Sequence, residues 1–345
     1  MDSPATNKPL FNISSLPAPV VQAPMAGGPS TPELAAAVST AGGLGFLAAG
    51  YKTASAVKAE IEATRRLTDS PFGVNVFVPQ PSMISPQALD QYARSLAPEA
   101  ERLGAALGDP RHDDDEWDAK LDVLLKEAPA VASFTFDLPD PAVVAALRQR
   151  GVYVISTVTS RPEALRAVDA GVDALCVQGP EAGGHRGTFD PARRPENESL
   201  HGLLEELADL RVPLIAAGGI TTAADTQAAL ARGAVAVQAG TAFLRADEAG
   251  TKAPHRMALA SGRFTATSVT RSFSGRNARG LHNEFMRRHD GDAPYGYPEI
   301  HHLTAPLRAA ASAAGDPEYM SLWAGTGFKH TVDGPAAKIL AALRP

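Results

Sequence analysis

Residues 213–244 read PLIAAGGITTAADTQAALARGAVAVQAGTAFL, and they contain one complete copy of the pattern that decides the fold. An apolar run over 213–219 ends in two glycines. Helix-forming residues follow from Thr221, and a second apolar run occupies 234–244. Continuous apolar runs of this length are typical of strands buried on both faces. The stretch therefore predicts a strand–helix–strand unit with parallel strands.

The same unit recurs along most of the chain. Helix-start signals, in which a capping residue precedes proline, lie between further apolar runs, as at Thr31-Pro32 and Ser160-Arg161-Pro162. Eight repeats of this kind predict an α/β fold, a (β/α)8 TIM barrel, and a doubly wound sheet is the alternative. The predicted strands are 20–26, 44–49, 72–78, 131–137, 153–158, 174–178, 213–219 and 234–244.

Two segments are longer than the repeat allows. Residues 80–128 are amphipathic and rich in charge, and they predict extra helices after the third strand. Residues 250–345 are rich in Ala, Arg and aromatic side chains, and they predict a helical cap packed on the barrel. We therefore expect a barrel over 1–249 and a C-terminal helical segment over 250–345.

Composition and charge exclude several classes of protein. The chain has 345 residues, of which 44% are hydrophobic, and this excludes disordered and collagen-like chains. It has 38 acidic and 32 basic residues, so a net charge of −6 gives no attraction to nucleic acid or to an anionic membrane. Cys176 is the single cysteine, which excludes an internal disulfide and favours a reducing compartment. Because residues 1–19 lack an apolar targeting segment, we expect a cytoplasmic location. A monomer and a homodimer both stay open, since the Ala-rich tail can pack on its own barrel or on a second subunit.

Two glycine turns point to a phosphate site. TIM-barrel active sites lie at the C-terminal ends of the strands, where Gly218-Gly219 and Gly240-Thr241 fall. Glycine allows the backbone to approach a ligand, and helix N-termini offer unpaired N–H groups to anions. No Gly-x-x-x-x-Gly-Lys motif is present, so the phosphate is expected on a cofactor tail. The alternative is that these glycines only form tight turns.

Polar side chains at other strand ends predict the rest of the site. Asn75 and Gln178 carry amides that both donate and accept hydrogen bonds, which suits the edge of an isoalloxazine ring. His185 lies in the glycine-framed loop 181–187, where an imidazole can act as a base or as a cation facing an anion. The alternative for Asn75 and Gln178 is that their amides only form hydrogen bonds within a loop. The alternative for His185 is that it is a surface histidine. The other histidines lack the spacing of metal ligands, so no metal site is expected.

Six sequence blocks, in order and over nearly the whole chain, resemble the nitronate monooxygenases (formerly 2-nitropropane dioxygenases) of the bacterial and fungal class I type. The blocks are QAPMAGG at 22–28, PFGVNVF at 71–77, QGPEAGGHRG at 178–187, the turn at 218–219, the turn at 238–241, and one C-terminal segment that matches at 270–276, 297–298 and 322–325.

This resemblance implies an FMN-dependent flavoprotein that oxidises alkyl nitronates, with propionate 3-nitronate as the expected substrate. O2 would be consumed, and a carbonyl product and nitrite would form by one-electron transfer to the flavin, as a detoxification. The resemblance makes His185 the catalytic residue and Arg186, Arg276 and Tyr297 the candidates for contact with the substrate. FMN would be bound by Ala23, Pro24, Met25, Ala26, Asn75, Gln178, Gly183, Gly184, Gly218, Gly219, Gln238, Ala239, Gly240 and Thr241.

Two other functions stay open on the sequence. An FMN-dependent enoyl-acyl carrier protein reductase shares the barrel and the histidine loop, and it would oxidise NAD(P)H. A non-catalytic barrel that stores flavin or senses a small molecule is the other, although storage needs no titrating group such as His185 beside the ring. Flavin bleaching by NADPH would indicate the reductase, and bound flavin without turnover would indicate the binding protein.

Overall fold

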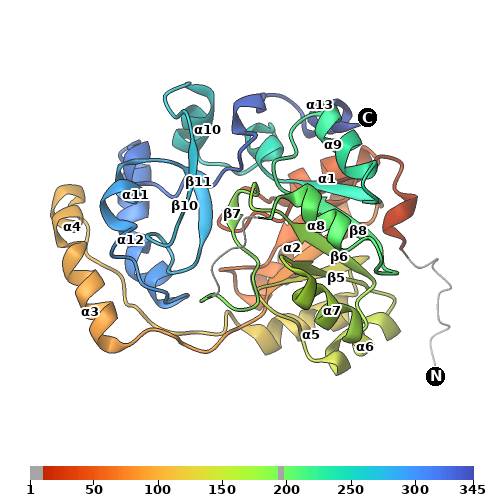
Figure 1. Ribbon diagram of the computed structural model, residues 1–345, viewed down its shortest axis with the longest axis horizontal. Coiled ribbons are helices and arrows are strands. Elements are labelled where there is room, and N and C mark those ends of the chain that lie inside the picture. Colours follow the sequence, from red (N-terminus) through yellow and green to blue (C-terminus); the bar gives the residue numbers. More distant parts are fainter. Residues whose placement is uncertain (1–10, 193–197) are drawn as a thin grey trace.

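A barrel of eight parallel strands forms the centre of the computed structural model, which describes residues 11–192 and 198–345 (Figure 1). Residues 1–10 of the polar N-terminal stretch, and 193–197, lie outside the described residues. A parallel bridge between Val21 and Leu44 joins the first strand to the second and closes the barrel, which confirms the predicted TIM barrel. The strands are β1 (Val20–Gln22), β2 (Gly45–Ala48), β3 (Phe72–Phe77), β4 (Val131–Thr135), β5 (Tyr153–Val158), β6 (Ala174–Gln178), β8 (Leu214–Ala217) and β9 (Ala236–Ala239).

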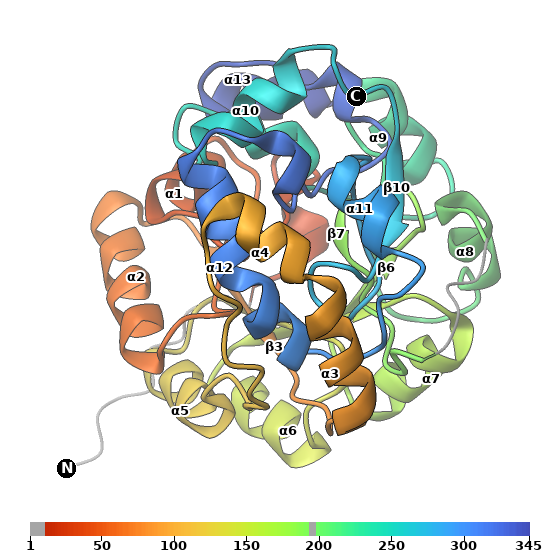
Figure 2. The ribbon, with the colours of Figure 1, turned by 90° about the vertical axis from the view of Figure 1, so that its left-hand side faces the viewer.

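Helices alternate with these strands and form a ring around the barrel (Figure 2). Their starts follow the predicted signals: the Thr31 hydroxyl accepts a hydrogen bond from the Leu34 amide at 3.0 Å, and Thr222 and Asp225 form a capping box. The described residues contain no helix with the length and apolar character needed to cross a membrane. The ring includes α1 (Pro32–Thr40), α2 (Ala54–Leu67), α5 (Trp117–Glu127), α6 (Pro141–Gln149), α7 (Arg161–Asp169), α8 (Leu200–Glu206) and α9 (Ala223–Leu230).

Four predicted strands are wrong in their C-terminal parts, and two of them, 20–26 and 213–219, end at Gln22 and Ala217. The predicted strand 234–244 ends at Ala239, where the chain turns into the short 3-10 helix η2 (Thr241–Arg245). The predicted strand 131–137 ends before Phe136, whose φ of +86° lies in the left-handed region. Apolar composition alone does not distinguish a buried strand from a buried turn, because both are continuous apolar runs.

The last helix of the barrel ring comes from the end of the chain. α13 (Ala336–Leu343) packs against α1 and α9, and Ile339, Leu340 and Leu343 share the core of the barrel strands and their helices. The division of the chain at residue 249 stays a proposal, and the packing of α13 assigns this helix to the barrel rather than to the cap.

The cap covers one end of the barrel and is built from two segments far apart in the sequence (Figure 2). Helices from 80–111 pack on helices of the tail, and Tyr92 of the first segment donates a hydrogen bond to the Ser272 carbonyl at 2.5 Å. Tyr92 and Phe273 also belong to one apolar core. The cap helices are α3 (Pro86–Ser95), α4 (Ala97–Leu103), α10 (Ala253–Ala260), α11 (Glu284–His289) and α12 (Glu299–Ala313).

The tail also contains strands, which the prediction of a helical cap did not include. β10 (Thr267–Thr270) and β11 (Ala278–Leu281) form an antiparallel sheet with β7 (Gly184–His185) of the histidine loop (Figure 1). His185 pairs with Ala278 in this sheet. The position of the predicted catalytic residue is therefore set by a strand of the tail.

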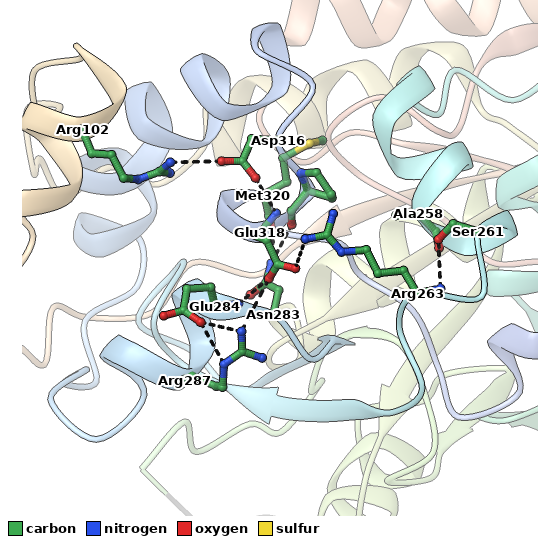
Figure 3. Close-up of polar contacts among 11 residues, drawn as sticks. Arg102, Ala258, Ser261, Arg263, Asn283, Glu284, Arg287, Asp316, Glu318 and Met320 are labelled. Atoms are coloured by element: carbon green, nitrogen blue, oxygen red, sulfur yellow. Dashed lines mark hydrogen bonds and ion pairs between the residues drawn. The ribbon is translucent and has the colours of Figure 1, made fainter.

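Polar contacts fasten the part of the tail that returns to the barrel mouth (Figure 3). The Glu318 carboxylate accepts a hydrogen bond from Arg263 at 2.7 Å, and the Asn283 side chain donates to the Met320 carbonyl at 2.8 Å. Glu318 lies in the short 3-10 helix η3 (Pro317–Tyr319), and the chain then leads through Met320 to Trp323. These contacts hold Met320 and Trp323 beside the cavity described below.

Candidate active site

A cavity of about 440 Å³ lies at the C-terminal ends of the barrel strands, beneath the cap. Its size is typical of small-molecule sites. His185 and every residue predicted to bind the cofactor line it, from Ala23 on the first strand to Thr241 after the last. The structure thus brings the predicted cofactor residues together, and their contacts with FMN remain a prediction.

The glycine turns after β8 and β9 present unpaired donors to this cavity. Gly218 and Gly219 have φ angles of +128° and +71°, which L side chains rarely adopt. The backbone N–H groups of Gly218, Gly219 and Gly240 have no acceptor among the described residues, and η2 begins at Thr241 without a side-chain cap. Converging free amides of this kind fit a phosphate group.

The Gln178 side chain fastens the histidine loop to the barrel. Its Nε2 donates to the His185 carbonyl at 3.0 Å, and its Oε1 accepts from the Gly187 amide at 2.8 Å. Both ends of the amide are therefore used within the protein. The observed contacts of Gln178 position His185, and contact with a ring edge remains a prediction.

The Asn75 side chain keeps one polar atom available. Its Nδ2 donates to Ser133 Oγ at 2.9 Å and to Thr135 Oγ1 at 3.0 Å, and Oδ1 has no donor among the described residues. Asn75 therefore offers a fixed acceptor in the wall of the cavity.

Aromatic rings surround His185 at the mouth of the barrel. The His185 ring centroid lies 5.9 Å from that of Phe136, 5.8 Å from that of Tyr297 and 5.5 Å from that of Trp323. His185 Nε2 lies 2.8 Å from Ser274 Oγ, and within the described chain Nδ1 has no hydrogen-bond partner. The imidazole is held in a defined orientation, with one nitrogen left for a ligand.

The surroundings keep the His185 imidazole neutral. Burial lowers its pKa to about 3, and repulsion from Arg276 and Arg308 acts in the same direction. Of the two roles that the sequence left open for His185, base or cation, the lowered pKa favours the base, because the free site holds a neutral imidazole near neutral pH. A neutral imidazole donates one hydrogen bond and accepts a proton at its other nitrogen.

Arg276, predicted to contact the substrate, is used inside the protein. Its side chain is 1% exposed and does not line the cavity. Its Nη1 donates to Gln80 Oε1 at 2.5 Å, its Nε to the Arg186 carbonyl at 3.2 Å, and its Nη2 to the Thr188 carbonyl. The guanidinium also lies 3.9 Å from the centre of the Phe136 ring. The structure therefore gives Arg276 a supporting position behind Phe136.

The two other substrate candidates also lie outside this cavity. Arg186 donates from Nη1 to the Gln178 carbonyl at 2.7 Å. Tyr297 lines a neighbouring cavity of about 530 Å³, and its hydroxyl donates to that of Tyr51 at 3.3 Å. Local sequence patterns identified segments that lie close to the cavity, but they could not show that the Arg186 and Tyr297 side chains point away from it.

Sequence reasoning missed several residues that the cap brings to the cavity. Ser274 and Trp323 lie within tail blocks that carry the family resemblance, so that signal was present. Tyr51, His301 and Arg308 belong to no motif. Tyr51 follows β2, and the folding of α12 over the barrel places His301 and Arg308 in the wall. Among the described residues that line the cavity are Lys252 and Arg308 but no Asp or Glu.

Barrel, cavity and enclosed imidazole together define a TIM-barrel enzyme. A family model for nitronate monooxygenase matches residues 8–344, and the chain belongs to this family of flavoprotein oxidoreductases. It is 40% identical to a nitronate monooxygenase of Paraburkholderia phytofirmans, over 97% of this chain and 93% of that protein. It is 37% identical to a probable nitronate monooxygenase of Bacillus subtilis, over 94% of each chain.

Two solved structures are similar to this chain over nearly their whole length. A nitroalkane oxidase from Streptomyces ansochromogenes is 48% identical and superposes with a TM-score of 0.91, over 95% of each chain. FabK from Thermotoga maritima is more distant: it is 27% identical with a TM-score of 0.73, over 96% of this chain and 93% of that one.

Proposed function

We propose that this protein is an FMN-dependent nitronate monooxygenase. It oxidises alkyl nitronates, with propionate 3-nitronate as the expected substrate, and uses O2 to form a carbonyl product and nitrite. The observation that carries the proposal is the cavity lining: a neutral, oriented His185 and cationic side chains without a carboxylate among the described residues. Such a lining suits an anionic substrate and an anionic cofactor tail. A cytoplasmic location, a detoxifying role and a monomeric or homodimeric state remain expectations from the sequence.

FMN fits the residues of the cavity. The free amides of Gly218, Gly219 and Gly240 would hold its phosphate, and Asn75 Oδ1 would accept a hydrogen bond from the ring system. Met25 and its neighbours would lie beneath the ring. When bound, FMN supplies the one-electron chemistry and the reaction with O2.

The protein's own part in the reaction is to bind the nitronate and to exclude water. A nitronate is already a stabilised carbanion, so it needs hydrogen-bond donors and positive charge rather than a strong base. His185 would hold the nitro oxygens through an N–H group, and Ser274 would keep the ring in place. The rings of Phe136 and Trp323 line the cavity and restrict the access of water.

Oxidation of neutral nitroalkanes is a second candidate activity. The 48% identity to a nitroalkane oxidase favours it, and so does the unpaired Nδ1 of a neutral His185, which could accept the α-proton. The proton would move from the α-carbon to the imidazole, which leaves the nitronate in the cavity.

Purification followed by oxygen uptake tests the proposed function. The purified protein should show flavin absorbance and should consume O2 with propionate 3-nitronate while nitrite accumulates. A colourless preparation that does not take up FMN would refute the proposal. Flavin bleaching by NADPH with an enoyl substrate would favour the reductase alternative, and bound flavin without any turnover would favour a binding protein.

The pH dependence should be flat over a wide range. Burial lowers the pKa of His185 to about 3 and that of His255 to about 4, moves that of His301 well below its usual value, and raises that of Tyr51 to about 12. We therefore expect kcat/KM for propyl-1-nitronate to vary by less than about twofold between roughly pH 5.5 and pH 9. A fall in kcat/KM as the pH drops through roughly 6.5, the usual histidine value, would show instead that His185 titrates normally and that its neutral form is required.

A further inference from the structure

Arg308 is a half-buried cation in the wall of the cavity, and it has no acidic partner among the described residues. Its Nε donates to Thr304 Oγ1 at 3.2 Å and its Nη2 to the His301 carbonyl at 2.8 Å, so one face of α12 holds the guanidinium. No ion pair joins Arg308 to a described carboxylate, and Nη1 has no acceptor within the described chain. Partial burial of a charge without a counter-charge still costs free energy, and a bound anion lowers that cost.

The phosphate of the cofactor is expected elsewhere. The proposed phosphate site at Gly218 and Gly240 follows β8 and β9. Arg308 interacts electrostatically with Tyr51, which follows β2 and whose ring contacts that of Phe77 on β3. In the ring of eight strands, β2 lies two strands from β9 and three from β8, so Tyr51 and the two glycine turns occupy different parts of the cavity wall. Arg308 is therefore available for an anion other than the phosphate.

Aromatic side chains connect Arg308 with the expected position of the nitronate. The Tyr51 and His301 rings are stacked at 4.1 Å, and the His301 ring centroid lies 6.3 Å from that of Tyr297, which in turn contacts His185. Repulsion from Arg308 helps to lower the pKa of His185, so the two groups influence each other across the same cavity. A short carbon chain with its nitro group at His185 would extend towards this wall.

On the basis of the proposed function, we infer that Arg308 binds a carboxylate on the carbon chain of the substrate and so makes the enzyme selective for carboxylated nitronates. The exposed Nη1 edge of the guanidinium supplies a charge-assisted hydrogen bond to the carboxylate. Arg308 thereby takes the role expected of Arg186 or Arg276, both of which are engaged elsewhere.

Substitution of Arg308 tests this inference with two substrates. Propionate 3-nitronate carries the carboxylate, and propyl-1-nitronate has a chain without it. In Arg308→Met, the ratio of kcat/KM for the first substrate to that for the second should fall roughly 10- to 100-fold, mainly through KM. Arg308→Lys should recover part of the ratio because the charge is retained. Arg287→Met, which removes an arginine paired with Glu284 outside the cavity, is the matched control and should keep the wild-type ratio.

A binding measurement keeps the test independent of turnover. Succinate should perturb the flavin absorbance of the holoprotein, and its Kd should rise at least about tenfold in Arg308→Met but not in Arg287→Met. An equal loss of kcat/KM with both nitronates, or unchanged succinate affinity, would overturn the inference. If circular dichroism shows that Arg308→Met is not folded, the same measurements on Arg308→Lys decide whether Arg308 binds the carboxylate. If the wild type oxidises neither nitronate, the proposed function fails, and succinate binding still decides the role of Arg308.

Discussion

Replacing His185 by asparagine is expected to lower the turnover of alkyl nitronates by about 100- to 10,000-fold while FMN stays bound. Asparagine retains an amide donor, but its side chain is shorter than that of histidine and cannot place an N–H group over the full extent of the imidazole. It also has no ring that fills the space between Phe136 and Trp323. FMN should remain because the free amides of Gly218 and Gly240 do not involve the imidazole. Steady-state oxygen uptake and the flavin spectrum measure the two effects separately.

The control for this prediction is an exposed histidine. His330 lies in the short 3-10 helix η4 (Phe328–His330), does not line the cavity, and His330→Asn should keep both flavin and activity. Full activity in His185→Asn would remove His185 from the catalytic machinery. Loss of flavin from that variant would show that the imidazole supports the cofactor instead.

Replacing Gly183 by alanine is expected to loosen the tail from the barrel mouth and to weaken flavin binding. A Cβ at this position would lie 2.4 Å from the Gly325 amide nitrogen and 2.5 Å from the Ala324 carbonyl carbon. Both are backbone atoms, so the tail must move, and the hydrogen bond from the Gly325 amide to Thr241 Oγ1 at 2.9 Å is lost. Overpacking of this kind costs about 1–3 kcal/mol of folding free energy. Each 1.4 kcal/mol of this cost that destabilises the FMN-binding conformation weakens FMN binding about tenfold.

Thermal unfolding and titration of the apoprotein with FMN measure this effect. Gly291→Ala is the matched control: no atom lies within 4 Å of the added Cβ and its φ is not left-handed, so we expect wild-type behaviour. A Gly183→Ala protein with the melting temperature and FMN affinity of the wild type would show that the contact with residues 324–325 is not needed to close the site.

The sequence alone was sufficient to predict which residues at the ends of strands lie at the barrel mouth. The apolar runs predict the barrel, and its topology places the C-terminal end of every strand at one mouth. Gly218 and Gly240 could therefore be assigned to adjacent turns, and His185 to the same opening, from their order in the chain. The structure confirms that all three line one cavity.

The sequence could not predict contacts between distant segments. The pairing of β7 with β11, the packing of α4 on α12, and the return of α13 to the barrel join parts of the chain with no shared local pattern. Local periodicity shows which face of an element is apolar, but not which other element covers it. For this reason the prediction of a helical tail did not include β10 and β11, and the proposed division at residue 249 did not assign α13 to the barrel.

The barrel, the glycine turns and the position of His185 follow from the amino-acid sequence, because short-range patterns and a closed parallel topology are enough to fix them. The direction of the side chains and their electrostatic state depend on the folded structure. It engages Arg276 and Gln178 within the protein, keeps His185 neutral by burial, and places Arg308 in the cavity wall. Burial and long-range charge depend on groups brought together from the whole chain, so they follow from the folded structure.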